Sequence, residues 1–183
     1  MILINLFGGP GIGKSTTAAA LYAGMSMNGI NAELVGEAAK SIVWDNCHAL
    51  LENQVLVTGR QFQRILRLVG KVDVAIADSP LILAYVYGFK LPYILALRNL
   101  IWKLEAELKA QGVETWNVIL KRDLTREYQP KGRVQQTLAE ALAFDKRIES
   151  MADPVHFCVE PPMLLNFIDD LMPHLKDRGI IKP

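Results

Sequence analysis

The sequence predicts an α/β fold built around a parallel sheet of five strands, and two observations carry this prediction. Five short apolar runs, each typical of a strand buried in such a sheet, alternate along the chain with segments of helical periodicity. A glycine-rich run, residues 8–15, directly follows the first apolar run and opens the first helical segment. The 183 residues suffice for one well-buried core, so we expect a single domain over residues 1–183.

The expected elements follow one another in a regular order. The apolar runs that predict strands are residues 2–7, 32–36, 72–78, 115–120 and 155–159. The segments that predict helices are residues 16–27, 38–44, 49–70 with a break near Thr58 and Gly59, 92–111, 135–148, and a terminal helix through Leu171. Residues 92–111 show the clearest helical pattern, because apolar positions recur at helical spacing and Gly112 follows directly.

The glycine-rich run reads Gly-Gly-Pro-Gly-Ile-Gly-Lys-Ser and fits G-x-x-x-x-G-K-[ST], the pattern of a phosphate-binding loop. Its context of strand, loop and helix argues against an incidental glycine-rich turn. We expect Lys14 to reach the β- and γ-phosphates of ATP or GTP, and the hydroxyl of Ser15 to ligate Mg²⁺. The residues expected to bind the nucleotide are Gly9, Gly11, Ile12, Gly13, Lys14, Ser15 and Thr16.

The third apolar run closes on an acid, Asp78, followed by Ser79 and Pro80. Ligands of open α/β sheets bind beyond the carboxyl ends of the strands, so Asp78 is expected near Ser15. It would hold Mg²⁺, directly or through water, or accept the proton of an attacking hydroxyl. The alternative is that Asp78-Ser79-Pro80 turns the chain and caps the next helix.

Glu37 ends the second apolar run at the equivalent place in the pattern. A carboxylate there can serve as a general base or anchor a substrate hydroxyl, and both roles make it a candidate catalytic and substrate-binding residue. A second interpretation is an acid that interacts with the start of a helix. The sequence does not decide between these interpretations, nor between Glu37 and Asp78 as the general base.

Basic residues recur at helical spacing within residues 49–71, at Arg60, Arg64, Arg67 and Lys71. Such a stripe is either a solvated helix face or a surface that contacts the phosphates of a nucleotide or nucleic acid. Arg60 and Arg64 are therefore candidate substrate residues.

The most cationic segment follows the fourth apolar run, and we expect residues 122–134 to form a lid. A lid that closes over a triphosphate excludes water, and its arginines place positive charge on the transferred phosphoryl group. Arg122 and Arg126 are the candidate catalytic arginines, and Arg133 is a candidate substrate contact. The alternative is an ordinary charged surface loop.

Composition restricts the partners. The chain has 20 Lys and Arg against 19 Asp and Glu, a net charge of +1, which gives no overall attraction to nucleic acid or to an anionic membrane. The first apolar run is too short for a signal peptide, and no later run reaches the ~20 residues that span a bilayer. Cys47 and Cys158 match no zinc spacing. These features favour a cytoplasmic protein with no structural zinc and no membrane partner.

The arrangement of these motifs along the chain resembles the small P-loop kinases. Within them it is most similar to a bacteriophage branch, often described as AAA-like ATPases, which includes kinases of 5-hydroxymethyluracil in DNA and is related to nicotinamide riboside kinases. The residues that carry this likeness are Gly8 to Ser15, Asp78-Ser79-Pro80, residues 128–135, and Glu140, Ala141 and Asp145. The resemblance covers nearly the whole chain. It implies a strand order of 2-3-1-4-5, ATP with Mg²⁺ as phosphoryl donor, and an acceptor bound over Glu37 and the helices that follow the second strand.

The resemblance also implies a reaction, the transfer of the γ-phosphoryl group of ATP to a hydroxyl. The acceptor it favours is the hydroxymethyl group of 5-hydroxymethyluracil in phage DNA, and a phage protein would act in the host cytoplasm. A free nucleoside, a nucleotide or nicotinamide riboside is the alternative acceptor. An ATPase switch that transfers the phosphoryl group only to water is a second class of function, and a nucleotide-binding regulator without turnover is a third.

Overall fold

The computed structural model describes residues 1–125, 127–128, 137–161 and 166–181. The elements in chain order are β1 (Ile2–Phe7), α1 (Lys14–Met27), β2 (Ala32–Val35), α2 (Ala38–Trp44), the short 3₁₀ helix η1 (His48–Glu52), α3 (Gln54–Leu66), β3 (Val74–Ala77), α4 (Leu83–Tyr87), α5 (Ile94–Ala110), β4 (Glu114–Leu120), α6 (Leu138–Glu149), β5 (Phe157–Val159) and α7 (Phe167–Asp177). No helix among the described residues is long and apolar enough to cross a membrane.

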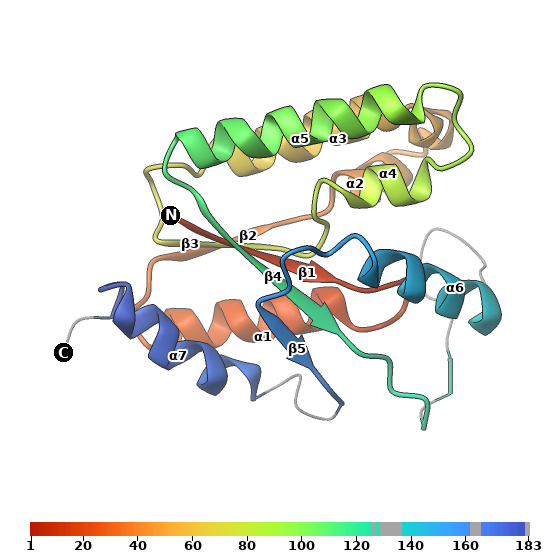
Figure 1. Cartoon of the computed structure of the whole chain (residues 1–183). Coiled ribbons are helices and arrows are strands. Elements are labelled where there is room, and N and C mark those ends of the chain that lie inside the picture. Colours follow the sequence, from red (N-terminus) through yellow and green to blue (C-terminus); the bar gives the residue numbers. More distant parts are fainter. Residues whose placement is uncertain (126, 129–136, 162–165, 182–183) are drawn as a thin grey trace.

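The five strands form one parallel sheet in the order β2-β3-β1-β4-β5, which confirms the predicted fold class and strand order. Helices α1 and α7 cover one face of this sheet, and α3 and α5 cover the other (Figure 1). Because every strand runs in the same direction, all five carboxyl ends lie along one edge. The glycine-rich run and Asp78 both begin at this edge.

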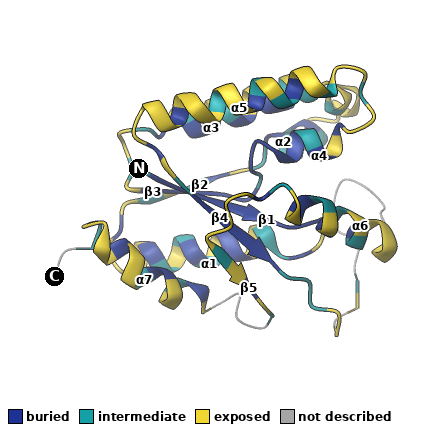
Figure 2. Ribbon diagram, in the orientation of Figure 1, coloured by how far each residue is buried: buried dark blue, intermediate teal, exposed yellow. Residues whose placement is uncertain are grey.

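Strand β1 is buried along its whole length, and its alternate side chains supply both halves of the core. Leu3 and Phe7 pack with residues of β3, α3 and α5. Ile4 and Leu6 pack with residues of α1 and α7. The central strands β1, β3 and β4 and the inward faces of the helices are accordingly the most buried parts of the ribbon (Figure 2). A central strand held from both sides is a rigid base for the loop that follows it.

The helix expected over residues 49–70 differs from the structure. A 3₁₀ turn covers residues 48–52, and α3 then begins after Asn53, whose side chain accepts a hydrogen bond from the N–H of Leu56 at 3.0 Å. This N-cap puts the break at Asn53 rather than near Thr58 and Gly59. Helix α3 continues through Gly59, with the hydroxyl of Thr58 donating to a backbone carbonyl one turn earlier. Tertiary packing outweighs the cost of about 1 kcal/mol for a helical glycine.

The prediction that four basic residues share one helix face is wrong, because the helix is shorter than expected. Helix α3 ends at Leu66, so Arg67 is its C-cap and Lys71 lies beyond the helix, in the turn before β3. Arg60 is exposed on α3, whereas Arg64 is partly buried and bonded to protein groups. Of Arg60 and Arg64, the two predicted substrate arginines on α3, only Arg60 presents an exposed side chain.

Two helices depart from the predicted pattern. Helix α4, of five residues, was not expected; it buries Leu83, Ala84 and Val86 against the core. Helix α7 extends beyond Leu171 to residue 177 and contains Pro173. Burial of Leu171 and Leu175 on its inner face maintains the helix through this proline, which lacks one N–H donor.

Candidate functional site

The glycine loop, residues 8–13, joins the carboxyl end of β1 to α1. Gly11 and Gly13 have φ angles of 71° and 105°, which lie in the left-handed region that side chains disfavour. Gly13 directly precedes α1, and its position receives no side-chain cap. The first N–H groups of such a helix carry partial positive charge, so this end of α1 can bind an anion such as a phosphate group.

Lys14, the first residue of α1, folds back over the glycine loop. Its ammonium group donates to the carbonyl oxygens of Gly8 and Gly9 at 2.7 and 2.9 Å. Ile12 points into the core beside α1, so this part of the loop presents its backbone to the outside rather than a side chain. Lys14 therefore lies against the glycine loop, and its contact with phosphates stays a prediction.

A hydrogen bond joins the start of α1 to the end of β3. Asp78 follows β3 directly, and β3 pairs with β1 in a register that sets Ala77 opposite Asn5. The hydroxyl of Ser15 donates to Oδ2 of Asp78 at 2.8 Å. Thr16, in the same first turn, is exposed. The structure thus brings together Ser15 and Asp78, the two residues predicted to ligate Mg²⁺, although they lie 63 positions apart in the sequence.

The carboxylate of Asp78 has unused capacity for a ligand. The residue is 8% exposed, and its Oδ1 is buried with no hydrogen-bond partner among the described residues. An uncompensated carboxylate oxygen at such a position costs free energy, which a cation would recover. A serine hydroxyl and a carboxylate are the oxygen donors that Mg²⁺ prefers, and one or two protein oxygens together with phosphates suffice for it. The residues present therefore fit Mg²⁺.

Glu37 lies at the corner between β2 and α2, on the same edge of the sheet. It is the N-cap residue of α2, half-buried, and its side chain makes no capping hydrogen bond. The guanidinium group of Arg64 braces this corner by donating to the carbonyl of Gly36 at 2.9 Å and to the hydroxyl of Ser41 at 2.8 Å. Arg64 thus binds the backbone carbonyl directly before Glu37 and a side chain of α2 after it.

Gln61 of α3 completes this part of the site, and the sequence analysis did not identify it. The residue is 4% exposed, and its Oε1 accepts from the N–H of Ala38 at 2.8 Å. Its Nε2 is buried without a partner among the described residues. A cavity of about 20 Å³, room for one water molecule, lies beside it and is lined also by Thr58, Ser79 and Pro80. Gln61 thus leaves one buried donor available beside the turn that follows Asp78.

Arg122, the first residue of the predicted lid, is bound to other groups of the protein. Strand β4 pairs with β1 as far as Ile119 opposite Phe7, so Arg122 emerges beside the glycine loop. Its Nε donates to Oδ2 of Asp145 at 2.7 Å, and its second guanidinium nitrogen donates to Oδ1 of Asp145 at 3.1 Å and to the carbonyl of Pro10 at 2.8 Å. The side chains of Arg122 and Asp145 are 8% and 11% exposed.

Asp145, on α6, also contacts the loop directly. Its Oδ1 accepts a hydrogen bond from the N–H of Gly9 at 2.7 Å. The sequence analysis used Asp145 only as part of a family pattern and gave it no role. The available signal was an acid on an otherwise apolar helix face, because Asp145 is buried in line with Ala141 and Ile148.

Two aromatic residues surround the Arg122–Asp145 ion pair. Burial of the Tyr87 hydroxyl, and then the negative charge of Asp145, raise the pKa of Tyr87 to about 12. The ring of Tyr128 lies under the guanidinium of Arg122, 5.6 Å from centroid to Cζ. Tyr87 therefore keeps its proton at neutral pH.

The remaining predicted lid arginines, Arg126 and Arg133, lie outside the described residues, as does most of residues 122–134. Their assignment as lid residues stays a prediction from the sequence.

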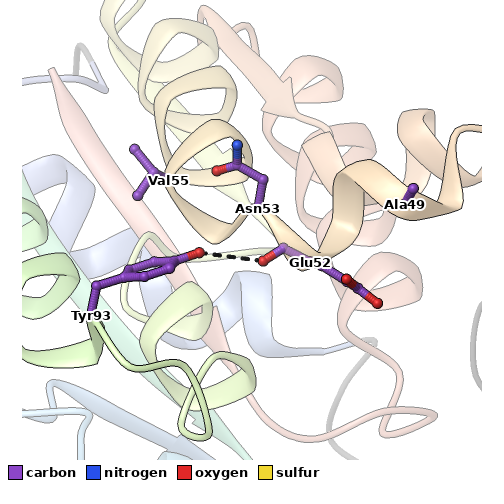
Figure 3. A pocket seen from close by; sticks show the side chains of 5 residues that line it. All are labelled: Ala49, Glu52, Asn53, Val55 and Tyr93. Atoms are coloured by element: carbon purple, nitrogen blue, oxygen red, sulfur yellow. Dashed lines mark hydrogen bonds between the residues drawn. The ribbon is translucent and has the colours of Figure 1, made fainter.

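A surface hollow lies away from these residues. It measures about 560 Å³ and is lined by Ala49, Glu52, Asn53, Val55 and Tyr93, from η1, the start of α3 and the residue before α5 (Figure 3). The hydroxyl of Tyr93 points across it to the carbonyl of Glu52 at 3.5 Å. None of its lining residues belongs to the glycine loop or carries a predicted role.

Solved structures share the whole architecture. The deoxyadenosine kinase of M. mycoides, solved with dCMP and dCDP, matches with a TM-score of 0.57 and 15% identity over 96% of this chain and 99% of its own. The chain has the P-loop kinase fold. Shikimate kinase of Aquifex aeolicus matches this fold over 98% and 99% of the two chains, with a TM-score of 0.53 and 11% identity. The APS kinase of Mycobacterium tuberculosis, in complex with AMPPNP and APS, matches over 95% and 96%, with a TM-score of 0.52 and 13% identity.

Sequence comparison gives no closer assignment. No protein-family model matches the chain, and no curated protein matches it. The P-loop kinase fold and the arrangement of the site's own residues are thus the basis for a functional assignment.

Proposed function

We propose that this protein is an ATP-dependent kinase that transfers the γ-phosphoryl group to a hydroxyl. The observation that carries the proposal is the hydrogen bond of 2.8 Å between Ser15 and Asp78, with Oδ1 of Asp78 still unsatisfied. It sets a hydroxyl from the first turn of α1 and a carboxylate from the neighbouring strand at one point beside the glycine loop. A loop that receives phosphates and a pair of oxygens that fits Mg²⁺ together make a site for a nucleoside triphosphate.

The residues of the site have separate tasks in this proposal. Backbone N–H groups of the glycine loop bind the phosphates, and Lys14 turns from the carbonyls of Gly8 and Gly9 to the β- and γ-phosphates. Ser15 and Asp78 hold Mg²⁺, which, when bound, offsets the charge of the phosphates. The preference for ATP over GTP follows the resemblance found in the sequence.

The chemical step is an in-line substitution at the γ-phosphorus. The acceptor oxygen forms a bond to phosphorus while the bond to the bridging oxygen of the leaving diphosphate breaks, which yields ADP and a phosphomonoester. The hydroxyl proton passes to a carboxylate, for which Glu37 and Asp78 are both candidates. Lid arginines, with Arg126 as the candidate, stabilise the charge on the phosphoryl group in transfer.

The acceptor proposed first is the hydroxymethyl group of 5-hydroxymethyluracil in DNA, as the family resemblance implies. A base within a duplex would have to be flipped out to bring its hydroxyl to the site.

A free nucleoside or nucleotide is the second candidate acceptor. The observation that favours it is the match to a deoxyadenosine kinase solved with dCMP and dCDP. The net charge of +1 also favours a small acceptor over a DNA surface.

Transfer from γ-labelled ATP with Mg²⁺ tests the proposal. The acceptors are DNA with and without 5-hydroxymethyluracil, free nucleosides, nucleotides and nicotinamide riboside, each with wild type and Lys14→Ala. Label on modified DNA alone supports the first acceptor, and label on a free small molecule supports the second. Release of label only as inorganic phosphate, with every acceptor, would replace the kinase by an ATPase.

A further inference from the structure

We propose that Asp145 and Arg122 are positioning residues that fix the glycine loop, and through it Lys14, in the geometry that receives a nucleotide's phosphates. This inference deepens the proposed function and rests on it, because it assigns the loop a nucleotide. It gives a task to α6, which supplies neither a predicted nucleotide contact nor a predicted Mg²⁺ ligand.

Gly9 is held from two sides. Its N–H donates to Oδ1 of Asp145 at 2.7 Å, and its carbonyl oxygen accepts from the ammonium group of Lys14 at 2.9 Å. The carboxylate on α6 and the cation on α1 therefore act on the same residue of the loop. A shift of Gly9 away from Asp145 would move the carbonyl that holds Lys14.

Arg122 binds the next residue of the loop, Pro10. The same guanidinium nitrogen that binds Oδ1 of Asp145 also donates to the carbonyl of Pro10 at 2.8 Å. Together, Asp145 and Arg122 bind an N–H of Gly9 and a C=O of Pro10, so two consecutive residues of the loop are fixed. Charge-assisted hydrogen bonds among little-exposed groups are the stronger kind. A lysine in place of Arg122 has no planar fork with which to make these three contacts together.

The fit between α6 and the loop depends on the glycine at position 9. A Cβ on Gly9 would overlap Oδ1 of Asp145 and would lie 3.0 Å from the carbonyl oxygen of Ala141. Both obstacles belong to α6. The first half of the glycine loop thus packs directly against helix α6.

A second ion pair joins the same two parts of the chain and provides a matched control. Lys121, directly before Arg122, donates to Glu149 of α6 at 2.8 Å. These side chains are 33% and 39% exposed, so the pair lies at the surface rather than under the loop. If the Arg122–Asp145 pair acted only by holding the end of β4 against α6, loss of the Lys121–Glu149 pair would weaken nucleotide binding to the same extent.

The first experiment measures the binding of AMPPNP with Mg²⁺ by titration calorimetry, together with the melting temperature. The variants of the Arg122–Asp145 pair are Asp145→Asn, Arg122→Lys and the double replacement Asp145→Leu with Arg122→Met. The double variant removes both charges at once, so that no unpaired charge is left in the core to prevent folding. Lys121→Ala and Glu149→Ala are the controls.

We expect Asp145→Asn and Arg122→Lys to weaken AMPPNP binding about tenfold, and the double replacement to weaken it further. The controls should change affinity less than about twofold, as exposed ion pairs contribute little. Equal affinity in wild type and the folded double variant would overturn the inference. An equal loss of AMPPNP affinity in the Asp145 and Arg122 variants and in the controls would also overturn the inference. The loss would then not depend on contact with the glycine loop.

The second experiment needs no nucleotide. Hydrogen exchange of residues 8–15 should be faster in Asp145→Asn and in the double variant than in wild type, and unchanged in Lys121→Ala. If wild type bound no AMPPNP but its loop exchange still depended on Asp145, the proposed function would fail while the positioning of the loop stood. Unchanged loop exchange in the double variant would refute the positioning itself.

Discussion

Asp78→Asn should separate the contribution of this carboxylate to stability from its contribution to catalysis. Asparagine keeps an oxygen that can accept from the Ser15 hydroxyl, so the bond of 2.8 Å can survive. It removes the negative charge whose second oxygen is buried and unpaired among the described residues. The free protein then loses a buried carboxylate oxygen that has no hydrogen-bond partner among the described residues, whereas the site loses a proposed metal ligand and a candidate base.

The substitution should leave the stability of the free protein unchanged or raise it, but should lower turnover. Replacing a buried carboxylate, one oxygen of which lacks a hydrogen bond, by a neutral amide should leave the free energy of unfolding unchanged or raise it by about 1 kcal/mol. For a chain of this size that corresponds to a rise in melting temperature of about 2–4 °C. Turnover should fall by a factor of about 10²–10⁴, the usual contribution of a general base or of a comparable electrostatic contact.

Thermal melting without nucleotide or metal, and steady-state transfer with ATP and Mg²⁺, measure these two effects in the same preparations. Saturating ATP and Mg²⁺ should also stabilise wild type more than the variant, because the ligand binds the folded state. A variant that turned over at the wild-type rate would remove Asp78 from the chemistry. A large drop in melting temperature without ligand would show that its charge is compensated in the folded protein.

Four further substitutions test other parts of the site. Lys14→Ala should abolish phosphoryl transfer while the fold, followed by circular dichroism, remains. Gly9→Ala should weaken ATP binding in a titration, and the loss should be smaller in an Asp145→Ala background, where the main obstacle to the new methyl group is gone. Arg126→Ala should lower kcat more than it weakens ATP binding, which steady-state kinetics with a separate binding titration can resolve. Arg60→Ala should weaken binding of a DNA acceptor and flatten its salt dependence, and an unchanged salt slope would leave Arg60 as a solvated residue.

The fold was predictable because its signals are local. Apolar runs marked all five strands, and the pattern around Lys14 and Ser15 fixed where the first strand ends and the first helix begins. The order 2-3-1-4-5 came from the resemblance rather than from the runs themselves. The error at the start of α3 was a matter of capping, since the pattern pointed to Gly59 while Asn53 provides the cap.

The site was predictable only in part, because its decisive contacts join distant residues. Ser15 and Asp78 could be paired in advance, since both follow the carboxyl ends of parallel strands. The partner of Arg122 could not, because Asp145 lies on a helix and Pro10 lies 112 positions away in sequence. Sequence reasoning placed the arginine at the edge of the site but could not say that an ion pair would hold its side chain.

Phosphoryl transfer from γ-labelled ATP to a hydroxyl acceptor is the measurement that tests the central claim most directly. With Mg²⁺ present, the label should appear on an acceptor of the panel, and Lys14→Ala should show none. Label on 5-hydroxymethyluracil DNA or on a free nucleoside or nucleotide would identify the acceptor as well. Label found only in inorganic phosphate, or no use of ATP by wild type, would contradict the assignment of this P-loop fold as a kinase.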